Sequence, residues 1–367
     1  MDVALCVDAL GPQPGGIGRY NWELCKGLAD SEEITSLRYV GHRRLIQDPR
    51  VLLNGGQLPR RSRYLRPFHD WRMRRALRSH LVHGPNYFLP MAAEAGIITV
   101  HDLSVFRYPE THPVERVQAF ERLFESSLSR ALHVITDTET VRREVIETFG
   151  ISPDRITAVA LGIEDRFRPL EKDSDETAFD DWELVQGRYG LCVSTLEPRK
   201  KISELLVAWR LLPADVRAQF PLVLAGGAGW QNDALQGEIR QAEREGWLKY
   251  LGFVAEDSLP LLYSGASLFI YPSIYEGFGL PPVEAMASGV PVIVADRSCL
   301  PEVCGDAARY VEPNDVEMFA ATIRDSLLDE AWREETRALG LRRSAQFTWS
   351  RCLDETLSVY RKVINPV

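Results

Sequence analysis

Two glutamates in a glycine- and proline-rich segment have the type and spacing that suit the binding of a phosphorylated sugar. Residues 271–296 read YPSIYEGFGLPPVEAMASGVPVIVAD, which predicts a strand, a glycine turn with Glu276, and a helix with Glu284 in its first turn. Because Pro281 and Pro282 have no N–H, the amides that can face an anion belong to the four residues before them. These residues are Gly277, Phe278, Gly279 and Leu280. A carboxylate repels phosphate, so we expect both glutamates to accept hydrogen bonds from hydroxyl groups.

A basic group lies at a second predicted junction between a strand and a helix. The sequence LEPRKK at residues 196–201 places Arg199 and Lys200 directly before the helix. Cations and helix amides together can neutralise a diphosphate leaving group, although a solvated charge run is the alternative.

A glycine loop follows the first predicted strand. The sequence GPQPGGIGRY at residues 11–20 places Gly15 and Gly16 before a helix, so bare amides can face a phosphate. Asn21 stands where a dinucleotide fingerprint has its third glycine, and no Lys-Ser/Thr pair completes a P-loop. A simple tight turn is the alternative.

His101 follows the apolar run ITV at a predicted strand end, with Asp102 beside it. Since ligands bind at the carboxyl ends of parallel strands, this place favours a catalytic contact with sugar or acceptor over a purely structural role. The seven histidines have no cysteine or acidic partners at a zinc spacing, so we expect no metal site.

The order of the predicted elements indicates an α/β fold. Short β-type runs alternate with helical patterns from end to end, which is typical of parallel sheets covered by helices. The acidic stretch at residues 171–186 precedes a restart of this alternation, and we interpret it as a linker. The sequence therefore predicts two Rossmann-like lobes, residues 1–170 and 187–346, that face each other across a cleft. The predicted strands occupy residues 3–9, 96–102, 133–138, 156–162, 189–195, 221–226, 249–254, 267–272 and 291–295.

Composition and charge narrow the class of protein. The 367 residues are 45% hydrophobic and 26% charged, as in an average globular protein, and the net charge of −9 argues against a nucleic-acid partner. Six scattered cysteines without a C-x-x-C pair suggest buried free thiols in a reducing compartment. Asp2 and Asp8 do not fit a signal peptide, and no run reaches about 18 apolar residues. We expect a cytoplasmic protein, either free or peripheral on the inner face of the membrane.

An arginine-rich segment favours that peripheral contact. Eight arginines lie between Arg60 and Arg78, interleaved with apolar residues that include Phe68 and Trp71. A basic segment with aromatic residues suits an anionic membrane surface. RNA binding and a solvated helix are the alternatives.

At these residues the sequence resembles the retaining glycosyltransferases of family GT4, which have the GT-B fold. Glu276 and Glu284 match the family's E-x7-E motif within EGFGLPPVEAMASG, GGIGRY matches its glycine loop, and LEPRK matches its diphosphate-binding loop. The segments HGPNYFLP (83–90) and TVHDLSVFRYPE (99–110) look most like those of bacterial O-antigen mannosyl- and rhamnosyltransferases. The resemblance covers nearly the whole chain.

The resemblance implies a role for each motif. Glu276 and the amides after it would bind the donor sugar and phosphates, Glu284 would bind the ribose, and Phe253 and Val254 of LGFV would bind the base. The final helix, within residues 347–367, would cross back to the N-terminal lobe.

The sequence departs from the family in two places. Ser194 and Thr195 stand where many relatives have an arginine, so Arg199 would have to supply that charge. Lys201 stands where asparagine or glycine is usual, which would alter the start of the following helix.

The reaction that the resemblance implies is a metal-independent, retaining transfer of a hexose, mannose or a deoxymannose such as rhamnose. The donor would be a nucleoside-diphosphate sugar, GDP-linked, and the acceptor a lipid-linked polysaccharide or O-antigen, with no other cofactor. A nucleotide-sugar epimerase, or another nucleotide-sugar-binding protein on a GT-B-like scaffold, is the alternative. An epimerase would act without an acceptor.

Overall fold

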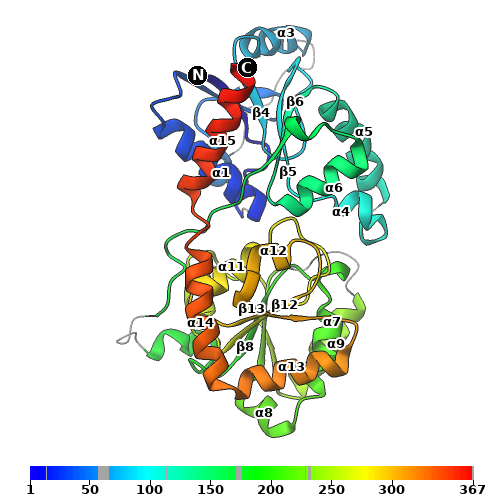
Figure 1. Cartoon of the computed structure of the whole chain (residues 1–367), viewed down its shortest axis with the longest axis vertical. Coiled ribbons are helices and arrows are strands. Elements are labelled where there is room, and N and C mark those ends of the chain that lie inside the picture. Colours follow the sequence, from blue (N-terminus) through cyan, green and yellow to red (C-terminus); the bar gives the residue numbers. More distant parts are fainter. Residues whose placement is uncertain are drawn as a thin grey trace. The chain divides into compact units, whose positions relative to one another are not determined.

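The computed structural model describes residues 1–13, 15–56, 66–112, 114–170, 176–227, 229 and 233–365, which group into two compact units (Figure 1). The first unit comprises Met1–Arg107, Pro113–Gly162 and Trp349–Val367, and the second comprises Tyr108–His112 and Ile163–Thr348. Each contains one sheet with helices packed on it, so the predicted α/β class with two Rossmann-like lobes is confirmed.

The sheet of the first unit has seven strands in the order β3-β2-β1-β4-β5-β6-β7, with β3 antiparallel to β2 and every other pair parallel. Strands such as β5, GIITV, are buried along their whole length because both faces of a parallel sheet are covered. The strands are β1 (Asp2–Cys6), β2 (Ser36–Gly41), β3 (Arg44–Ile46), β4 (Leu81–Gly84), β5 (Gly96–Val100), β6 (Ala131–Thr136) and β7 (Ile156–Ala158). The helices are α1 (Gly16–Asp30), α2 (Arg50–Leu53), α3 (Arg66–Leu77), α4 (Ser104–Arg107), α5 (Val114–Leu128), α6 (Glu139–Phe149) and α15 (Trp349–Ile364).

The sheet of the second unit has six parallel strands in the order β10-β9-β8-β11-β12-β13. The strands are β8 (Gly190–Val193), β9 (Leu222–Ala225), β10 (Leu248–Tyr250), β11 (Leu268–Tyr271), β12 (Val292–Ala295) and β13 (Ala308–Val311). The helices are α7 (Ile202–Arg210), α8 (Ala214–Gln219), α9 (Asp233–Arg244), α10 (Leu259–Ser264), α11 (Leu280–Ala287), α12 (Leu300–Cys304), α13 (Val316–Leu328) and α14 (Glu330–Ser344).

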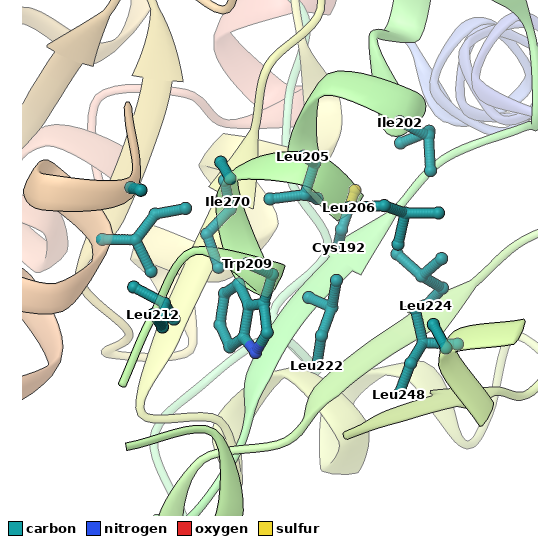
Figure 2. Close-up of a cluster of buried hydrophobic side chains, with 14 of the residues drawn as sticks. Cys192, Ile202, Leu205, Leu206, Trp209, Leu212, Leu222, Leu224, Leu248 and Ile270 are labelled. Atoms are coloured by element: carbon teal, nitrogen blue, oxygen red, sulfur yellow. The ribbon is translucent and has the colours of Figure 1, made fainter. Parts of the chain in front are cut away.

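A buried cluster fixes α7 on the second sheet (Figure 2). Leu205 and Trp209 of α7 pack with Cys192 of β8 and Leu222 of β9, and each such side chain contributes about 1.5–3 kcal/mol when it is fully buried. A Cβ atom on Gly190 would lie 2.2 Å from Cη2 of Trp209, so β8 needs a glycine under this ring. The packing of α7 therefore also fixes the loop directly before it, which contains Arg199 and Lys200.

Helix α15 belongs to the first unit, as the family resemblance implied, and Figure 1 shows it beside α1. The hydroxyl group of Tyr360 lies 2.7 Å from Nδ1 of His83 in β4, and Nε2 of His83 lies 2.8 Å from Oγ1 of Thr99 in β5. Burial lowers the pKa of His83 to about 3, so this imidazole is neutral at physiological pH. The final helix is thus hydrogen-bonded to the sheet of the first unit.

The boundaries between the units differ from the predicted ones. The chain leaves the first unit after Gly162 rather than after residue 170, and residues 176–186 of the segment that we interpreted as a linker group with the second unit. The physical reason is burial, because Phe179 in the 3₁₀ helix Glu176–Trp182 is only 1% exposed and packs against Gly265. Residues 171–175 lie outside the described residues.

The cysteines confirm one prediction from composition. All six are buried and none forms a disulfide, and burial raises the pKa of Cys25 to about 12. A thiol with such a pKa is protonated and unreactive at neutral pH.

Among the described residues, no helix combines the length and the apolar composition that a membrane span needs.

Candidate active site

Two loops that were predicted to bind the donor begin at neighbouring strand ends. Strands β8 and β11 pair in parallel, with Leu191 opposite Phe269, and they lie where the order of strands reverses along the second sheet. In open α/β sheets, ligands bind at the carboxyl ends of strands at this reversal point. LEPRKK follows β8 and the glycine turn with Glu276 follows β11. The topology therefore brings these two loops to one place.

Glu276 and Lys200 form a buried ion pair at this place. The Lys200 ammonium donates to Oε1 of Glu276 and lies 2.8 Å from the hydroxyl group of Tyr271, which is itself 2.9 Å from the same carboxylate oxygen. Glu276 is 9% exposed and Lys200 is 7% exposed. Of the four residues predicted as catalytic, Glu276, Lys200 and Arg199 lie together.

The guanidinium of Arg199 connects the two loops. Its Nη1 atom donates to the carbonyl oxygen of Tyr275 at 2.8 Å and lies 3.4 Å from Oε2 of Glu276. The carbonyl oxygen of Arg199 accepts from the N–H of Ile274 at 3.0 Å. This position supports the expectation that Arg199 supplies the charge that relatives place at Ser194 or Thr195.

Glu197 is a member of this group that sequence reasoning missed. Its Oε2 atom accepts from Nε of Arg199 at 3.2 Å, and its Oε1 atom accepts from the hydroxyl group of Thr195 at 2.7 Å. The signal in the sequence was an acid inside an otherwise basic run. The buried group contains two cations and two carboxylates, so its charges balance within the protein.

The electrostatics of the pair fix its charge state. Burial raises the pKa of Glu276, but Lys200 and Arg199 outweigh burial and lower it to about 2. Burial and the charge of Arg199 lower the pKa of Lys200, against the opposing effect of Glu276. Glu276 is therefore a carboxylate at neutral pH, able to accept hydrogen bonds but unsuited to act as a general acid.

The glycine turn leads directly into α11. Gly279, the residue before the helix, has a φ of +91°, and a Cβ atom there would lie 2.9 Å from Cδ2 of Leu300, so both backbone and space require glycine. The side chain of Phe278 is buried, with its ring 5.3 Å from the ring of Phe347. Phe278 can therefore offer a ligand only its backbone, which is the role predicted for residues 277–280.

Glu284 lies in α11 and is buried at a different place from the ion pair of Lys200 and Glu276. Its Oε2 atom accepts from the hydroxyl group of Tyr263 in α10 at 2.8 Å. Phe253, predicted to bind the base, is exposed and follows β10, while Val254 is half-buried. Strand β10 is three strand spacings from β11, or about 14 Å. Phe253 is thus available for stacking but does not belong to the charged group.

His101 lies in the first unit with both ring nitrogens bound to acceptors. Nδ1 is 2.8 Å from Oδ2 of Asp137, and Nε2 is 2.8 Å from the carbonyl oxygen of Pro85. Although burial lowers the pKa of His101, Asp137 outweighs burial and raises it, which favours the doubly protonated ring. Asp137, which follows β6, was missed in the sequence. We interpret His101 as a residue that connects three strand ends, since its imidazole has no nitrogen left for a sugar.

The glycine loop of the first unit has open space beside it. Gly15 immediately precedes α1, whose first residue is Gly16, and a Cβ atom on Gly15 would meet nothing within 4 Å. The N-cap residue Gly15 has no side chain with which to cap this helix start. The amides of the first turn are suited to an anion.

The second departure from the family is Lys201, and its backbone conformation shows why asparagine or glycine is usual at this position. It adopts a left-handed conformation with φ +55° and ψ 38°, a region that asparagine and glycine enter at lower cost. The helix still begins at Ile202, so the substitution alters the cost of this turn rather than its geometry. Among the residues that the structure describes, no three or more His, Cys, Asp or Glu side chains form a cluster suited to a metal ion.

Comparison with known proteins places this geometry in a family. The model of "Glycosyltransferase Family 4" matches residues 14–167, and that of "Glycosyl transferases group 1" matches residues 175–342. The chain is 39% identical over 364 residues to the O-antigen chain mannosyltransferase B of Escherichia coli, covering 94% of this chain and 96% of that protein. The chain belongs to glycosyltransferase family 4.

Two solved structures have the same fold as this glycosyltransferase. Sucrose-phosphate synthase of Thermosynechococcus elongatus matches with a TM-score of 0.75 at 20% identity, covering 99% of both chains. The Anabaena protein HepE in complex with UDP-glucose matches with a TM-score of 0.73 at 18% identity, covering 98% of this chain and 100% of that one. The GT-B fold predicted for this glycosyltransferase is thereby confirmed.

Proposed function

We propose that this glycosyltransferase transfers mannose from GDP-mannose to a lipid-linked polysaccharide, with retention of the anomeric configuration. The observation that carries the proposal is the buried group of Glu276, Lys200 and Arg199 at the reversal point of the second sheet. The choice of mannose is supported by the 39% identity to an O-antigen chain mannosyltransferase over 94% of the chain.

The proposed mechanism assigns charge stabilisation to the two loops. As the bond from the sugar to the diphosphate breaks, negative charge develops on the leaving group. Arg199, Lys200 and the amides of residues 277–280 are the donors that would stabilise this charge. The carboxylate of Glu276 would accept hydrogen bonds from the sugar, and Glu284 those from the ribose.

The proposed retention follows a front-face route. Glu276 is bound by two cations and has a pKa of about 2, so it is a weak nucleophile and a weak base. In the route that we propose, the acceptor hydroxyl group therefore attacks from the side of the departing phosphate. The phosphate takes its proton.

Thermal unfolding in the presence of nucleotide sugars tests the donor. We expect GDP-mannose at about 100 times its Kd to add about 2.7 kcal/mol of stability, and UDP-glucose and UDP-N-acetylglucosamine to add little. Transfer from GDP-mannose is expected to persist in excess EDTA, since Arg199, Lys200 and backbone amides would donate hydrogen bonds to the diphosphate in place of a metal ion. A larger shift with a UDP sugar contradicts the donor, and turnover that EDTA abolishes and Mg²⁺ restores contradicts metal independence.

We also propose that α3 contacts the anionic inner face of the cytoplasmic membrane, where a lipid-linked acceptor lies. Phe68 and Trp71 are 52% and 54% exposed, with the guanidinium of Arg72 5.9 Å from the ring of Phe68 and that of Arg75 5.6 Å from the ring of Trp71. These four residues share one helix face by their spacing, whereas Met73 is buried. Arg60, Arg61 and Arg63 of the predicted segment lie outside the described residues.

Sedimentation with vesicles tests this contact. Each arginine near an anionic surface contributes about 1 kcal/mol, screened over about 8–10 Å, so binding should require anionic lipid and weaken with salt. We expect a variant with serine at Arg72, Arg74, Arg75 and Arg78 to lose most binding. The matched control changes four exposed arginines of the second unit to serine, namely Arg240, Arg244, Arg324 and Arg342. Equal sedimentation of both variants would show that only net charge matters and remove α3 from the interface.

A further inference from the structure

Ser298 lies in the loop between β12 and α12 and has a strained backbone. Its φ is +56°, in the left-handed region that serine rarely enters and glycine enters freely. The residue is partly exposed and follows the carboxyl end of β12. Non-glycine residues in this region cluster at functional sites, where surrounding contacts compensate for the strain.

The hydroxyl group of Ser298 bonds to the backbone on both sides of Glu276. It donates to the carbonyl oxygen of Glu276 at 2.6 Å and accepts from the N–H of Glu276 at 3.2 Å. The two residues are 22 positions apart in the sequence. They meet because β11 and β12 are parallel neighbours, with Ile270 opposite Ile293, so that the loops after them begin side by side.

The next residues of the same loop contact the other end of the glycine turn. Cδ2 of Leu300 lies 2.9 Å from the position that a Cβ atom on Gly279 would take. Helices α11 and α12, which begin at these two loops, pack against each other. Residues 298–300 thus contact both Glu276 and Gly279, the two ends of the turn.

We propose that Ser298 is a positioning residue that orients Glu276 and the following amides toward the donor. The proposal rests on the proposed role of Glu276. The two hydrogen bonds fix the peptide groups on either side of Glu276, and these peptide groups set the direction of its carboxylate and of the turn that follows. Glycine would remove the strain at this position, but it would lack the hydroxyl group that makes both hydrogen bonds.

The Ser298→Gly variant separates positioning from stability. Loss of the hydroxyl group frees the turn, and small misplacements of catalytic groups cost about 10²-fold, so we expect kcat/KM for the donor to fall between about 10-fold and 10²-fold. The midpoint of thermal unfolding should stay close to that of the parent, since the relief of left-handed strain by glycine offsets the loss of the two hydrogen bonds. Ser298→Ala should show the same kinetic loss with a lower midpoint, because alanine keeps the left-handed strain and lacks the two hydrogen bonds of the hydroxyl group.

The matched control is Glu183→Gly in the same unit. Glu183 also has a left-handed backbone, with φ +47°, and its side chain pairs with Lys249 rather than with the charged group. We expect this variant to keep the parent's kcat/KM. All variants are assayed with the nucleotide sugar on which the parent is most active in the donor panel, starting with GDP-mannose.

Two outcomes overturn the proposal. One is a Ser298→Gly variant with the donor kinetics of the parent. The other is a kinetic loss in Ser298→Gly that is accompanied by an equally clear fall in the unfolding midpoint of that variant, which indicates a merely structural role. A parent that prefers another nucleotide sugar overturns the proposed donor instead, and the comparison of Ser298→Gly with the parent then decides on Ser298 with that nucleotide.

Discussion

The Lys200→Ala variant is expected to transfer sugar about 10²-fold more slowly than the parent, because it removes a buried cation that acts mainly as the leaving group develops charge. It is also expected to be less stable. The ammonium of Lys200 bonds to Glu276 and Tyr271, and removing one partner of a buried pair typically costs about 3–5 kcal/mol. Steady-state kinetics at saturating acceptor and a denaturant titration measure the two effects.

A double variant distinguishes catalysis from stability. In Lys200→Met with Glu276→Gln both charges are gone, so much of the lost stability should return while activity stays low. The control is Lys201→Ala, because the ammonium of Lys201 bonds to Glu204. This variant should retain turnover within about threefold of the parent. Parental turnover in a folded Lys200→Ala protein would remove Lys200 from the mechanism.

Glu276→Gln and Glu284→Gln are expected to weaken the binding of different parts of the donor. Glutamine replaces one acceptor oxygen by an NH2 donor and removes the charge of the other, and weakening a charged hydrogen bond in this way costs about 1–3 kcal/mol, or about 5- to 150-fold in Kd. For Glu276→Gln this loss should appear with GDP-mannose but not with GDP. Lys200 and Arg199 lose a competing carboxylate in that variant, so GDP should bind as tightly as before or more tightly. Glu284→Gln should weaken both ligands.

Titration calorimetry with GDP and GDP-mannose measures this difference. The glutamine side chains keep the volume of the glutamates, so packing around Tyr271 and Tyr263 is conserved in both variants. Equal losses for both ligands in both variants would show that the two carboxylates do not divide the donor between them.

The motifs that sequence reasoning found are those in which local chemistry is visible over a few residues. The turn at Glu276 has glycine and proline signals, and helix α6 (Glu139–Phe149) has visible ends in the sequence because Thr138 caps its start and left-handed Gly150 ends it. Strand β4 was not predicted, since it has four residues and a buried His83 that only a hydrogen-bonded partner makes possible.

The site residues that were missed depend on contacts distant in sequence. Tyr271 looks like any apolar residue of its strand, and only the position of Lys200 beside it gives its hydroxyl group a role. Glu197 was hidden by the basic residues around it. Ser298 reaches Glu276 through the pairing of β11 with β12. Such pairings follow from sheet order, which no local pattern specifies.

The return of α15 to the first unit has a consequence for synthesis on the ribosome. The helix supplies Cys352, Leu357 and Tyr360 to the interior of that unit, and 186 residues of the second unit separate it from Gly162. At about 5–20 residues per second, the nascent first unit exists for roughly 10 to 40 s without its last helix. The second unit can reach its final packing earlier, because almost all of its residues are continuous in the chain. The N-terminal half is therefore the later of the two to complete its fold, and during this interval the face of its sheet that α15 will cover is the surface most in need of a chaperone.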